Sequence, residues 1–435
     1  MSATTRGVSL FAGVGLLYLL VGFGQSWDLA LTILNDGLIV AIMALGVNMQ
    51  WGYAGLFNIG VAGFFALGGL GVALVTKAPA PGAWDAGTPR ILLALLVGAG
   101  VIYGAMRLYN GMERGRTRGY ALAAVLILGA ILFRMIYDPA VAAVEAITPA
   151  STGNVGGLGL PVPVSWFIGG VIAAGAAWAV AKTALGLRSD YLAIATLGIG
   201  QIIIAVLMNE DWLDRGVKNI IDIQRWPVPY EVDLQKAAWF QSYAQSIGMD
   251  IRTASTVFVG LCFAVLFTVI LLILLALAEL SLNSPWGRMM RAIRDNEDAA
   301  EAMGKDVKRR HLQIFVLGSA VIGIAGALYV ILHGLMAPQS YNDPLRYTFL
   351  IWAMVILGGS GNNWGSVLGA LIIMLLWDEA GSVGPDILRF LTHPMPDGVI
   401  KAHLIDNAVQ MRLPVVGIVL LLVLRFAPRG LIPEK

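Results

Sequence analysis

Amide side chains within an apolar, glycine-rich stretch are the first residues whose chemistry has to be explained. Asn48 and Asn58 lie in residues 46–71, GVNMQWGYAGLFNIGVAGFFALGGLG, together with Gly52, Gly55 and Gly60. In a bilayer, a helix broken by glycines is tolerated only where it packs inside protein or lines a cavity, and in transporters such breaks often border the substrate path. The stretch therefore predicts a polar path, close helix packing through small residues, or both.

A second set of polar residues follows the basic turn at residue 188. Asp190, Tyr191, Thr196 and Gln201 occur there in an otherwise apolar segment. A carboxylate near the start of a helix is favoured by the helix dipole, which accounts for Asp190 without any function. The alternative is that these groups also line the predicted path.

The polar segment 283–311, NSPWGRMMRAIRDNEDAAEAMGKDVKRRH, separates two long apolar runs. Ser284 is a favourable N-cap and Pro285 suits the first helical position, so one helix should run from 285 to 303. Gly304 should end it, because glycine easily adopts the left-handed conformation. One face of this helix is mostly apolar, made by Met289, Ile293, Asn296, Ala300 and Met303. We expect a short amphipathic helix outside the bilayer that fits a groove on a partner protein.

Composition places the whole chain in a membrane. It has 435 residues, of which 58% are hydrophobic and 13% charged, and its mean hydropathy is +0.77. These values lie far outside the range of soluble globular proteins. The single cysteine, Cys262, falls in an apolar run, so a disulfide framework and a Cys-based metal site are excluded. Residues 8–24 lack a small-residue cleavage site and are expected to be a retained first helix.

The expected fold is an all-α, polytopic transmembrane helical bundle in which residues 1–435 form a single domain. A spanning helix needs about 20 apolar residues, and about twelve candidates occur, some of them short or broken. The candidates are residues 8–24, 28–49, 55–75, 90–107, 119–137, 162–181, 190–208, 255–280, 312–333, 346–358, 365–378 and 412–426. With a cytoplasmic N-terminus, the inner segments carry most Lys and Arg, and segment 283–311 is then cytoplasmic.

Residues 209–254 are the longest polar segment on the predicted outer side. They combine charged residues with aromatic ones such as Trp212, Trp226 and Trp239. Aromatic residues near a membrane surface usually form interfacial belts. The alternative is an external loop on which an extracytoplasmic binding protein lands.

Several kinds of active site are absent from the sequence. No phosphate-binding loop G-x-x-x-x-G-K-[ST] and no zinc motif H-E-x-x-H occurs, and the 4 histidines are scattered. The chain is therefore expected to be neither an ATPase nor another enzyme, and to hold no metal. Asp36 is expected to be the only acidic residue well inside a candidate helix, where a charged group suggests a function. One carboxylate is weak support for the alternative of an ion-gradient-driven secondary transporter of a small solute.

Several stretches resemble the permease subunits of ABC importers. Asp298-Ala299-Ala300, three residues and then Gly304 resembles their EAA loop, with Asp in place of the usual Glu. The run GRMMRAIRDNEDAAEAMG is similar to the Liv-type M subunits, the permeases for branched-chain amino acids. Residues 46–71, 187–198, 355–369 and 425–435 also resemble that family, whereas 77–150 and 378–411 are covered least. Whether 46–71 and 355–369 form an internal repeat is left open.

The resemblance implies the role of each part. It implies a permease translocating branched-chain or similar small apolar amino acids, with urea, amides or aromatic acids as the alternative cargo. Residues of the EAA-like loop would couple the chain to an ATPase: Arg294, Glu297, Asp298, Ala299, Ala300 and Gly304.

The resemblance also implies partners and a location. The partners would be a second permease subunit forming a heterodimer, two ATP-binding subunits carrying ATP and Mg²⁺, an extracytoplasmic substrate-binding protein and membrane lipid, with no nucleic acid and no cofactor of its own. The location would be the bacterial inner membrane with both termini cytoplasmic.

Overall fold

Long helices dominate the computed structural model, which describes residues 3–147, 153–393 and 398–434. Within these residues there is no strand, and 10 helices are long and apolar enough to cross a membrane. These are α1 (Ala3–Gly24), α2 (Trp27–Ala54), α5 (Thr88–Gly111), α6 (Arg116–Glu145), α7 (Val162–Ala184), α8 (Ser189–Asn209), α12 (Ile251–Asn283), α15 (Val307–His333), α17 (Asn363–Ser382) and the continuous pair η4 (Ala408–Met411) and α20 (Arg412–Phe426). The prediction of an all-α, multi-pass helical bundle is confirmed.

Two of the predicted spans are shorter apolar helices. The span predicted at 55–75 begins only at residue 61, as α3 (Val61–Thr76), because residues 55–60 form a non-helical break after α2. The span predicted at 346–358 consists of a π-helical turn, η3 (Leu345–Phe349), which continues into α16 (Leu350–Gly358). Broken or short spans were expected at both places, and the structure confirms them.

Helix ends correct one statement made from the sequence. The helix α17 continues to Ser382 and α12 to Asn283, beyond the predicted ends at 378 and 280. Asp378 and Glu279 therefore lie inside helices. Asp36 is therefore not the only acidic residue within a membrane-spanning helix. Both α12 and α17 continue beyond the end of their apolar runs, so a prediction from apolarity alone ends them too early.

The helix α2 forms the centre of the bundle and packs against α12, α15, α16 and α17. In its most apolar window, 83% of the residues are buried. Small residues allow this close packing: a Cβ added to Gly46 would lie 2.7 Å from the carbonyl oxygen of Gly318 in α15. Such small-residue contacts are the usual way that helices approach closely in membranes.

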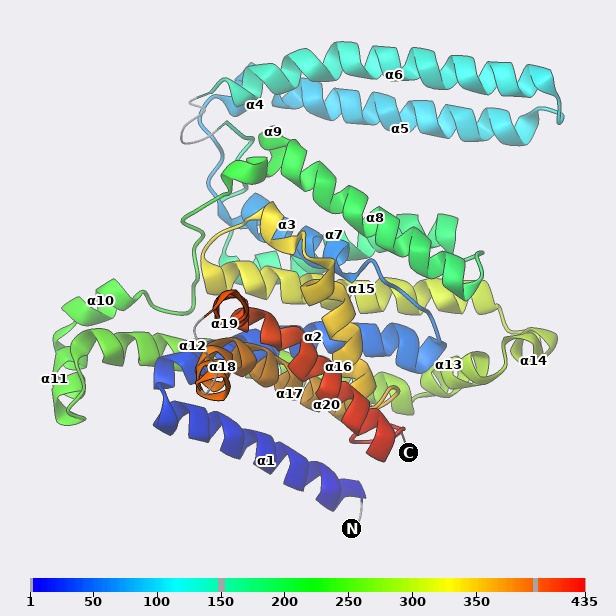
Figure 1. The fold of residues 1–435 in the computed structure, drawn as a ribbon. Helices are drawn as coiled ribbons and strands as arrows, with labels where there is room; N and C mark the ends of the chain where they lie inside the picture. Colours follow the sequence, from blue (N-terminus) through cyan, green and yellow to red (C-terminus); the bar gives the residue numbers. More distant parts are fainter. Residues whose placement is uncertain (1–2, 148–152, 394–397, 435) are drawn as a thin grey trace.

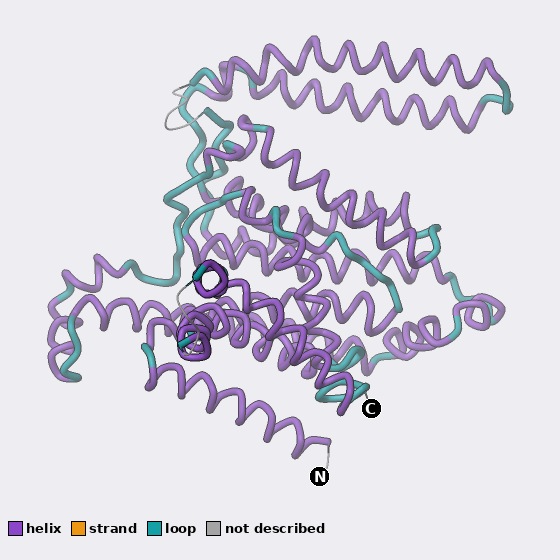
Figure 2. The backbone as a smooth tube through the Cα atoms, in the orientation of Figure 1, coloured by secondary structure: helices purple, strands orange, loops and turns teal. Residues whose placement is uncertain are grey.

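The two ends of the bundle carry different short helices (Figure 1). One end, called the α13 end, holds α13 (Pro285–Asp295), α14 (Glu297–Ala302) and both chain termini. The opposite α11 end holds α10 (Glu231–Lys236), α11 (Ala238–Ser246), α18 (Gly384–Thr392) and α19 (Val399–Asp406). The predicted external loop 209–254 contains α9 (Asp211–Asp214), η1 (Gly216–Lys218), α10 and α11, at the end opposite α13. Loops join the helices mainly at these two ends, as Figure 2 shows.

The helices α5 and α6 form a hairpin beside the main bundle (Figure 1). They pack on each other and join the rest mainly through α4 (Ala83–Ala86) and α9. In the most apolar 18-residue stretch of each helix, only 17% of the residues of α5 and 6% of those of α6 are buried. Side chains such as Leu96 and Leu128 are exposed. Such apolar faces are compatible with lipid, the expected surrounding of a membrane helix.

Candidate functional site

The polar segment 283–311 begins with the predicted helix. The Ser284 hydroxyl accepts a hydrogen bond from the Gly287 backbone N–H at 3.3 Å, and Pro285 occupies the first turn of α13. The serine oxygen satisfies a backbone N–H that has no helical partner, and the proline has no N–H that would need one. The predicted start of this helix is confirmed.

The same helix does not continue to Met303, which corrects the prediction of a single rod. Asn296 is extended, with φ −157° and ψ 99°, and its side chain accepts a hydrogen bond from the Ala299 N–H at 2.9 Å. Asparagine is a favourable N-cap, so it ends α13 and starts α14. Gly304 has φ 74°, the left-handed conformation predicted for it. The two helices form a bent unit, called the α13–α14 elbow (residues 285–304).

Most of the predicted docking residues are accessible on this elbow. Glu297, Asp298 and Ala299 are exposed, whereas Ala300 is buried against Ile293 and Val307. The predicted apolar stripe is thus right for Ile293 and Ala300 as apolar contacts, but both pack on Val307 of this chain and are not free to enter a groove on a partner. It is wrong for Met303, which is 79% exposed because the bend at Asn296 changes the face that α14 presents.

Arg294 ties the elbow to the bundle. Its guanidinium donates to the Gly52 carbonyl at the end of α2 and to the Glu434 carboxylate at 2.9 Å, and it also pairs with Asp295 at 3.2 Å. Burial lowers the pKa of Arg294, but the bonds with Glu434 and Asp295 outweigh burial and raise that pKa. The side chain therefore stays charged and links α13, α2 and the C-terminal segment.

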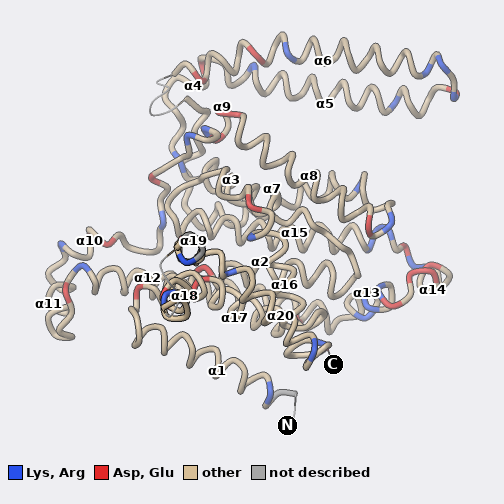
Figure 3. Tube along the Cα trace, viewed as in Figure 1, with Lys and Arg blue, Asp and Glu red and all other residues tan. Residues whose placement is uncertain are grey.

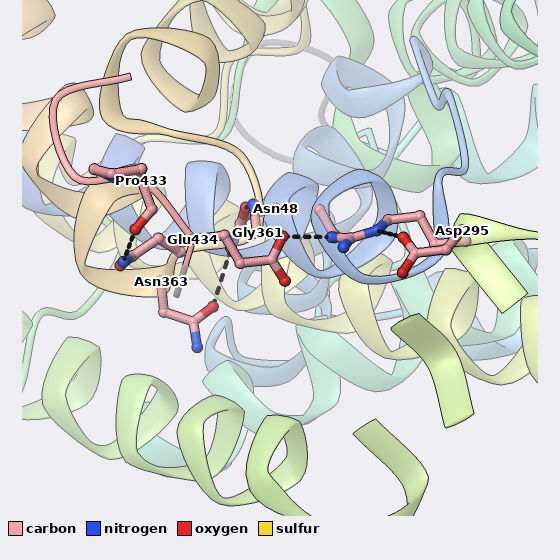
Figure 4. Close-up of polar contacts among 9 residues, drawn as sticks. Asn48, Asp295, Gly361, Asn363, Pro433 and Glu434 are labelled. Carbon is pink, nitrogen blue, oxygen red and sulfur yellow. Dashed lines mark hydrogen bonds and ion pairs between the residues drawn. The ribbon is translucent and has the colours of Figure 1, made fainter. Parts of the chain in front are cut away.

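The Arg294 contacts continue into a buried amide cluster at the α13 end. Asn48 Nδ2 donates to Asn363 Oδ1 at 3.0 Å, and Asn48 Oδ1 accepts from the Gly361 N–H at 2.8 Å. The Tyr53 hydroxyl donates to the same Asn363 oxygen. Figure 4 shows Asn48, Gly361, Asn363 and Glu434 grouped together, with Asp295 to one side. We call this group the inner network: Asn48, Tyr53, Arg294, Gly361, Asn363 and Glu434.

The helix break at residues 55–60 is held by polar contacts of its own. Asn58 donates to Gln50 Oε1 at 2.8 Å and accepts from the Gly60 N–H at 2.9 Å. The Thr196 hydroxyl of α8 accepts from the Ile59 N–H at 3.0 Å. A Cβ on Gly60 would lie 2.5 Å from the Thr196 carbonyl oxygen, which explains the glycine.

The structure brings some of the predicted path residues together. Asn48, Gly52, Asn58, Gly60 and Thr196 all take part in the contacts around the α2–α3 break. Asn48 and Asn58 are fully buried and bond to protein, so in this conformation they stabilise the break.

The remaining path residues lie elsewhere. Gly55 is the left-handed cap of α2, with φ 70°. Asp190 and Tyr191 are exposed at the start of α8, and Gln201 is half-buried in the middle of that helix. The path assignment remains a prediction for all of these residues.

Sequence reasoning missed four members of this region: Tyr53, Glu279, Asn363 and Glu434. Glu279 accepts a hydrogen bond from Asn363 Nδ2 at 3.0 Å, near the end of α12. With Glu434 and Arg291 it lines a cleft of about 290 Å³ at the α13 end. A carboxylate closing the most apolar run of the chain was the available signal for Glu279.

The stretches 46–71 and 355–369, both rich in glycine and amides, meet in space. Asn48 belongs to the first, while Gly361 and Asn363 belong to the second. A Cβ on Gly52 would lie 2.6 Å from the Gly361 nitrogen, so the two backbones touch. This contact explains their shared composition.

The described residues contain no group of three or more His, Cys, Asp or Glu side chains that could hold a metal ion. The polar contacts of this region position helices relative to one another.

Comparison with known proteins identifies the family. The family described as "Branched-chain amino acid transport system / permease component" matches residues 29–138 and 112–424. The high-affinity permease protein LivM of Escherichia coli K12 is 28% identical over 211 residues, which are 48% of each chain. The chain thus aligns with about half the length of that relative.

Permeases of other organisms are further relatives. The probable permease LivM of Methanocaldococcus jannaschii is 25% identical over 398 residues, covering 91% of this chain and 90% of that one. A fructose import permease, FrcC of Rhizobium meliloti, is 28% identical over 136 residues, 30% of this chain and 36% of FrcC. No solved structure matches. Since the family match extends over most of the sequence, from residue 29 to residue 424, the chain belongs to the family of branched-chain amino acid transport system permease components.

Proposed function

We propose that this chain is the membrane permease subunit of an ABC importer for branched-chain amino acids, driven by separate ATP-hydrolysing subunits. The observation that carries the proposal is an exposed α13–α14 elbow joined to the central helix within a chain of this permease family. Exposed Asp298 and Ala299 offer a contact surface for a partner. Arg294 connects that surface to the end of α2.

Movement of the partner would be transmitted through the inner network. A push on α14 displaces α13, and Arg294 carries the displacement to the Gly52 carbonyl and to Glu434. Through Asn48, Gly361 and Asn363 the same contacts join α2 to the start of α17. A buried, fully bonded polar cluster is rigid, which suits it to transmit force between helices.

The proposed partners fit the two ends of the bundle. Two ATP-binding subunits, with their ATP and Mg²⁺, would sit at the α13 end, and an extracytoplasmic binding protein at the α11 end. Lys and Arg are visible at both ends of the bundle in Figure 3, including around α13 and near both termini. The predicted inner segments carry most of them, which favours a cytoplasmic α13 end by the positive-inside rule. Exposed Trp226 and Trp239 belong to the segment at the α11 end. The chain would work in a bacterial inner membrane beside a second, different permease subunit.

Uptake by the reconstituted complex tests the proposal. Proteoliposomes containing this chain, its partner permease, the ATPase subunits and the binding protein should accumulate leucine with internal ATP. An ATPase subunit unable to hydrolyse ATP should abolish accumulation, even when a proton or sodium gradient is imposed. Accumulation driven by the gradient alone would support the secondary-transporter alternative and overturn the proposal.

A further inference from the structure

Three ionisable side chains lie inside helices on the far side of the bundle from the inner network. Asp36 belongs to α2, Asp378 to α17 and Arg346 to the π-helical turn η3, and each is half-buried. Ionisable groups within membrane-spanning helices are costly and commonly mark a solute or ion path. A π-helical turn is likewise frequent at functional sites. We call these residues the charged layer: Asp36, Arg346 and Asp378.

The inner network fixes these residues at a common height. Asn48 lies within hydrogen-bonding distance of both Gly361 and Asn363. With a rise of about 1.5 Å per residue, Asp36 is about 18 Å along α2 from Asn48, and Asp378 about 22 Å along α17 from Asn363. Arg346 is about 18 Å from Gly358, at the end of α16. The charged layer therefore lies about 18–22 Å from the inner network, toward the α11 end, a separation shorter than the hydrocarbon core of about 30 Å.

Packing brings α2 and α17 together at this height, and α16, which continues the η3 turn, packs on both helices. A Cβ on Gly37, the residue after Asp36, would lie 3.8 Å from Cβ of Met374, one turn before Asp378. The charge of Arg346 acts on both Asp36 and Asp378. His333 likewise lies within electrostatic range of Asp36, and Arg412 within electrostatic range of Asp378. The Arg346 guanidinium thus lies within electrostatic range of both carboxylates.

The charged layer differs from an ordinary structural ion pair because its members are held apart. Throughout the part of the chain that the structure describes, no carboxylate oxygen lies within 4.0 Å of the Arg346 guanidinium, and neither Asp36 nor Asp378 has an ion-pair partner. Half-buried charges that form no ion pair have to be solvated by water or by a ligand.

An aromatic wall adjoins the charged layer. The guanidinium carbon of Arg346 is 5.4 Å from the centre of the Tyr347 ring. Tyr347 stacks on Phe65 at 5.2 Å and donates a hydrogen bond to the Tyr329 hydroxyl at 3.1 Å, and Tyr341 packs on Phe65 at 5.2 Å. Phe65, Tyr341 and Tyr347 are buried, so their ring faces are taken up by packing on one another beside the charged layer.

We propose that the charged layer is a binding site for the zwitterionic form of an apolar α-amino acid during its passage through the chain. The planar Arg346 guanidinium suits the α-carboxylate, which it can bind through two parallel hydrogen bonds. Asp36 and Asp378 suit the α-ammonium group. The inference rests on the proposed function and adds a site within the membrane that requires both charges of the solute, so that an uncharged sugar would bind poorly.

Direct binding without the extracytoplasmic protein tests the site. The assembled permease–ATPase complex in detergent should bind radiolabelled leucine, and isopentylamine, which lacks the carboxylate, should compete poorly. Arg346→Gln and Asp36→Asn should each weaken binding about 10- to 100-fold, the loss expected for one charge-assisted contact. Arg346→Lys, which keeps the charge but not the fork, should weaken it less. Arg389→Gln on α18 is the matched control, because Arg389 is 65% exposed and pairs only with Asp386, and it should bind as the wild type does.

The outcomes separate this inference from the proposed function. If folded Arg346→Lys and Asp36→Asn complexes bind leucine as the wild type does, the charged layer is not the site, even where ATP-driven leucine uptake persists. Equal competition by isopentylamine and leucine would also overturn the inference. Absence of ATP-driven uptake by the wild-type complex would instead overturn the proposed function. Should Arg346→Gln fail to assemble, Arg346→Lys and Asp36→Asn decide the result.

Discussion

The inner network and the charged layer contain polar groups in the same bundle, yet they treat those groups in opposite ways. In the inner network, Asn48 and Asn363 bond to each other, and Arg294 bonds to Glu434 and to the Gly52 carbonyl. In the charged layer, Arg346 and Asp36 lie within electrostatic range without forming an ion pair among the described residues. The first set is satisfied by protein, and the second has no ion-pair partner among the described residues.

The difference distinguishes residues that stabilise the fold from residues that are available to bind a ligand. A satisfied buried network rigidifies the helices that it joins, so removing one member should lower stability. A group that has no protein partner contributes little to the fold, and its loss should change ligand binding instead. Measuring stability and transport separately for variants in each region therefore tests whether the two regions have these different roles.

Gly52→Leu should have the largest effect, because it forces apart two backbones of the inner network. A Cβ at this position would lie 2.6 Å from the Gly361 nitrogen and 2.9 Å from its Cα. Backbone atoms cannot move aside as a flexible side chain can, so we expect a loss of more than about 4 kcal/mol and little folded protein. Size-exclusion chromatography of the detergent-solubilised protein measures this outcome.

The matched control for this substitution is Gly13→Leu. Gly13 is exposed on α1, and a Cβ there would meet no other atom within 4 Å. This variant should elute as the wild type does. A well-folded Gly52→Leu protein would show that the contact between the two glycine-rich stretches is not required.

Asn363→Leu should have the next largest effect on stability. Its side chain accepts from Asn48 and Tyr53 and donates to Glu279, so the substitution leaves buried polar groups unpaired. We expect a loss of about 1–3 kcal/mol, measured as a lower thermal unfolding midpoint in detergent. Asp36→Asn, in the charged layer, should leave that midpoint unchanged. Equal losses in both variants would remove the distinction between the two regions.

Local patterns predicted the start of α13 and the break after α2. Ser284, Pro285 and Gly304 act through the backbone of their own turn, so their residue types were sufficient. The glycines and amides of 46–71 predicted a broken helix, because a straight apolar helix does not need them. The fold class followed from the length of the apolar runs.

Contacts between distant segments could not be predicted in the same way. Arg294 and Glu434 are 140 residues apart, and Asn48 and Asn363 are 315 apart. No local period reveals such pairs. The bend at Asn296 was missed because asparagine was read as a member of a helical stripe, whereas its side chain caps α14. Asp378 was missed because α17 extends beyond its most apolar part.

Asp214 extends the comparison to an unpaired acid outside the spans. Burial, opposed by the Gly216 N–H and assisted by the charge of Asp211, raises the pKa of Asp214 from 3.8 to about 7. An acid with a raised pKa binds its proton more tightly in the folded state, so stability falls as pH rises from about 4 through 7. Residues 209–219 should exchange amide hydrogens faster at pH 8 than at pH 5.5, after correction for intrinsic rates.

Asp214→Asn should remove this pH dependence, because the amide cannot ionise. Asp233→Asn, on the exposed face of α10, should retain it. An unchanged profile in Asp214→Asn would assign the pH dependence to another group. The effect should stay local to the α11 end, since Asp214 makes no contact with the inner network among the hydrogen bonds of the described residues.

Asp298→Glu should have the smallest effect, because it changes neither region directly. Asp298 is exposed in the first turn of α14, where either carboxylate interacts favourably with the helix dipole. ATP-driven leucine uptake should stay within about twofold of the wild type, as expected for a surface substitution that keeps its charge. Asp298→Lys reverses that charge on the surface proposed to meet the ATPase, so uptake should fall while the unfolding midpoint stays nearly constant. If Asp298→Glu abolished uptake, or Asp298→Lys supported it fully, the α13–α14 elbow would not be the contact through which force reaches Arg294 and the inner network.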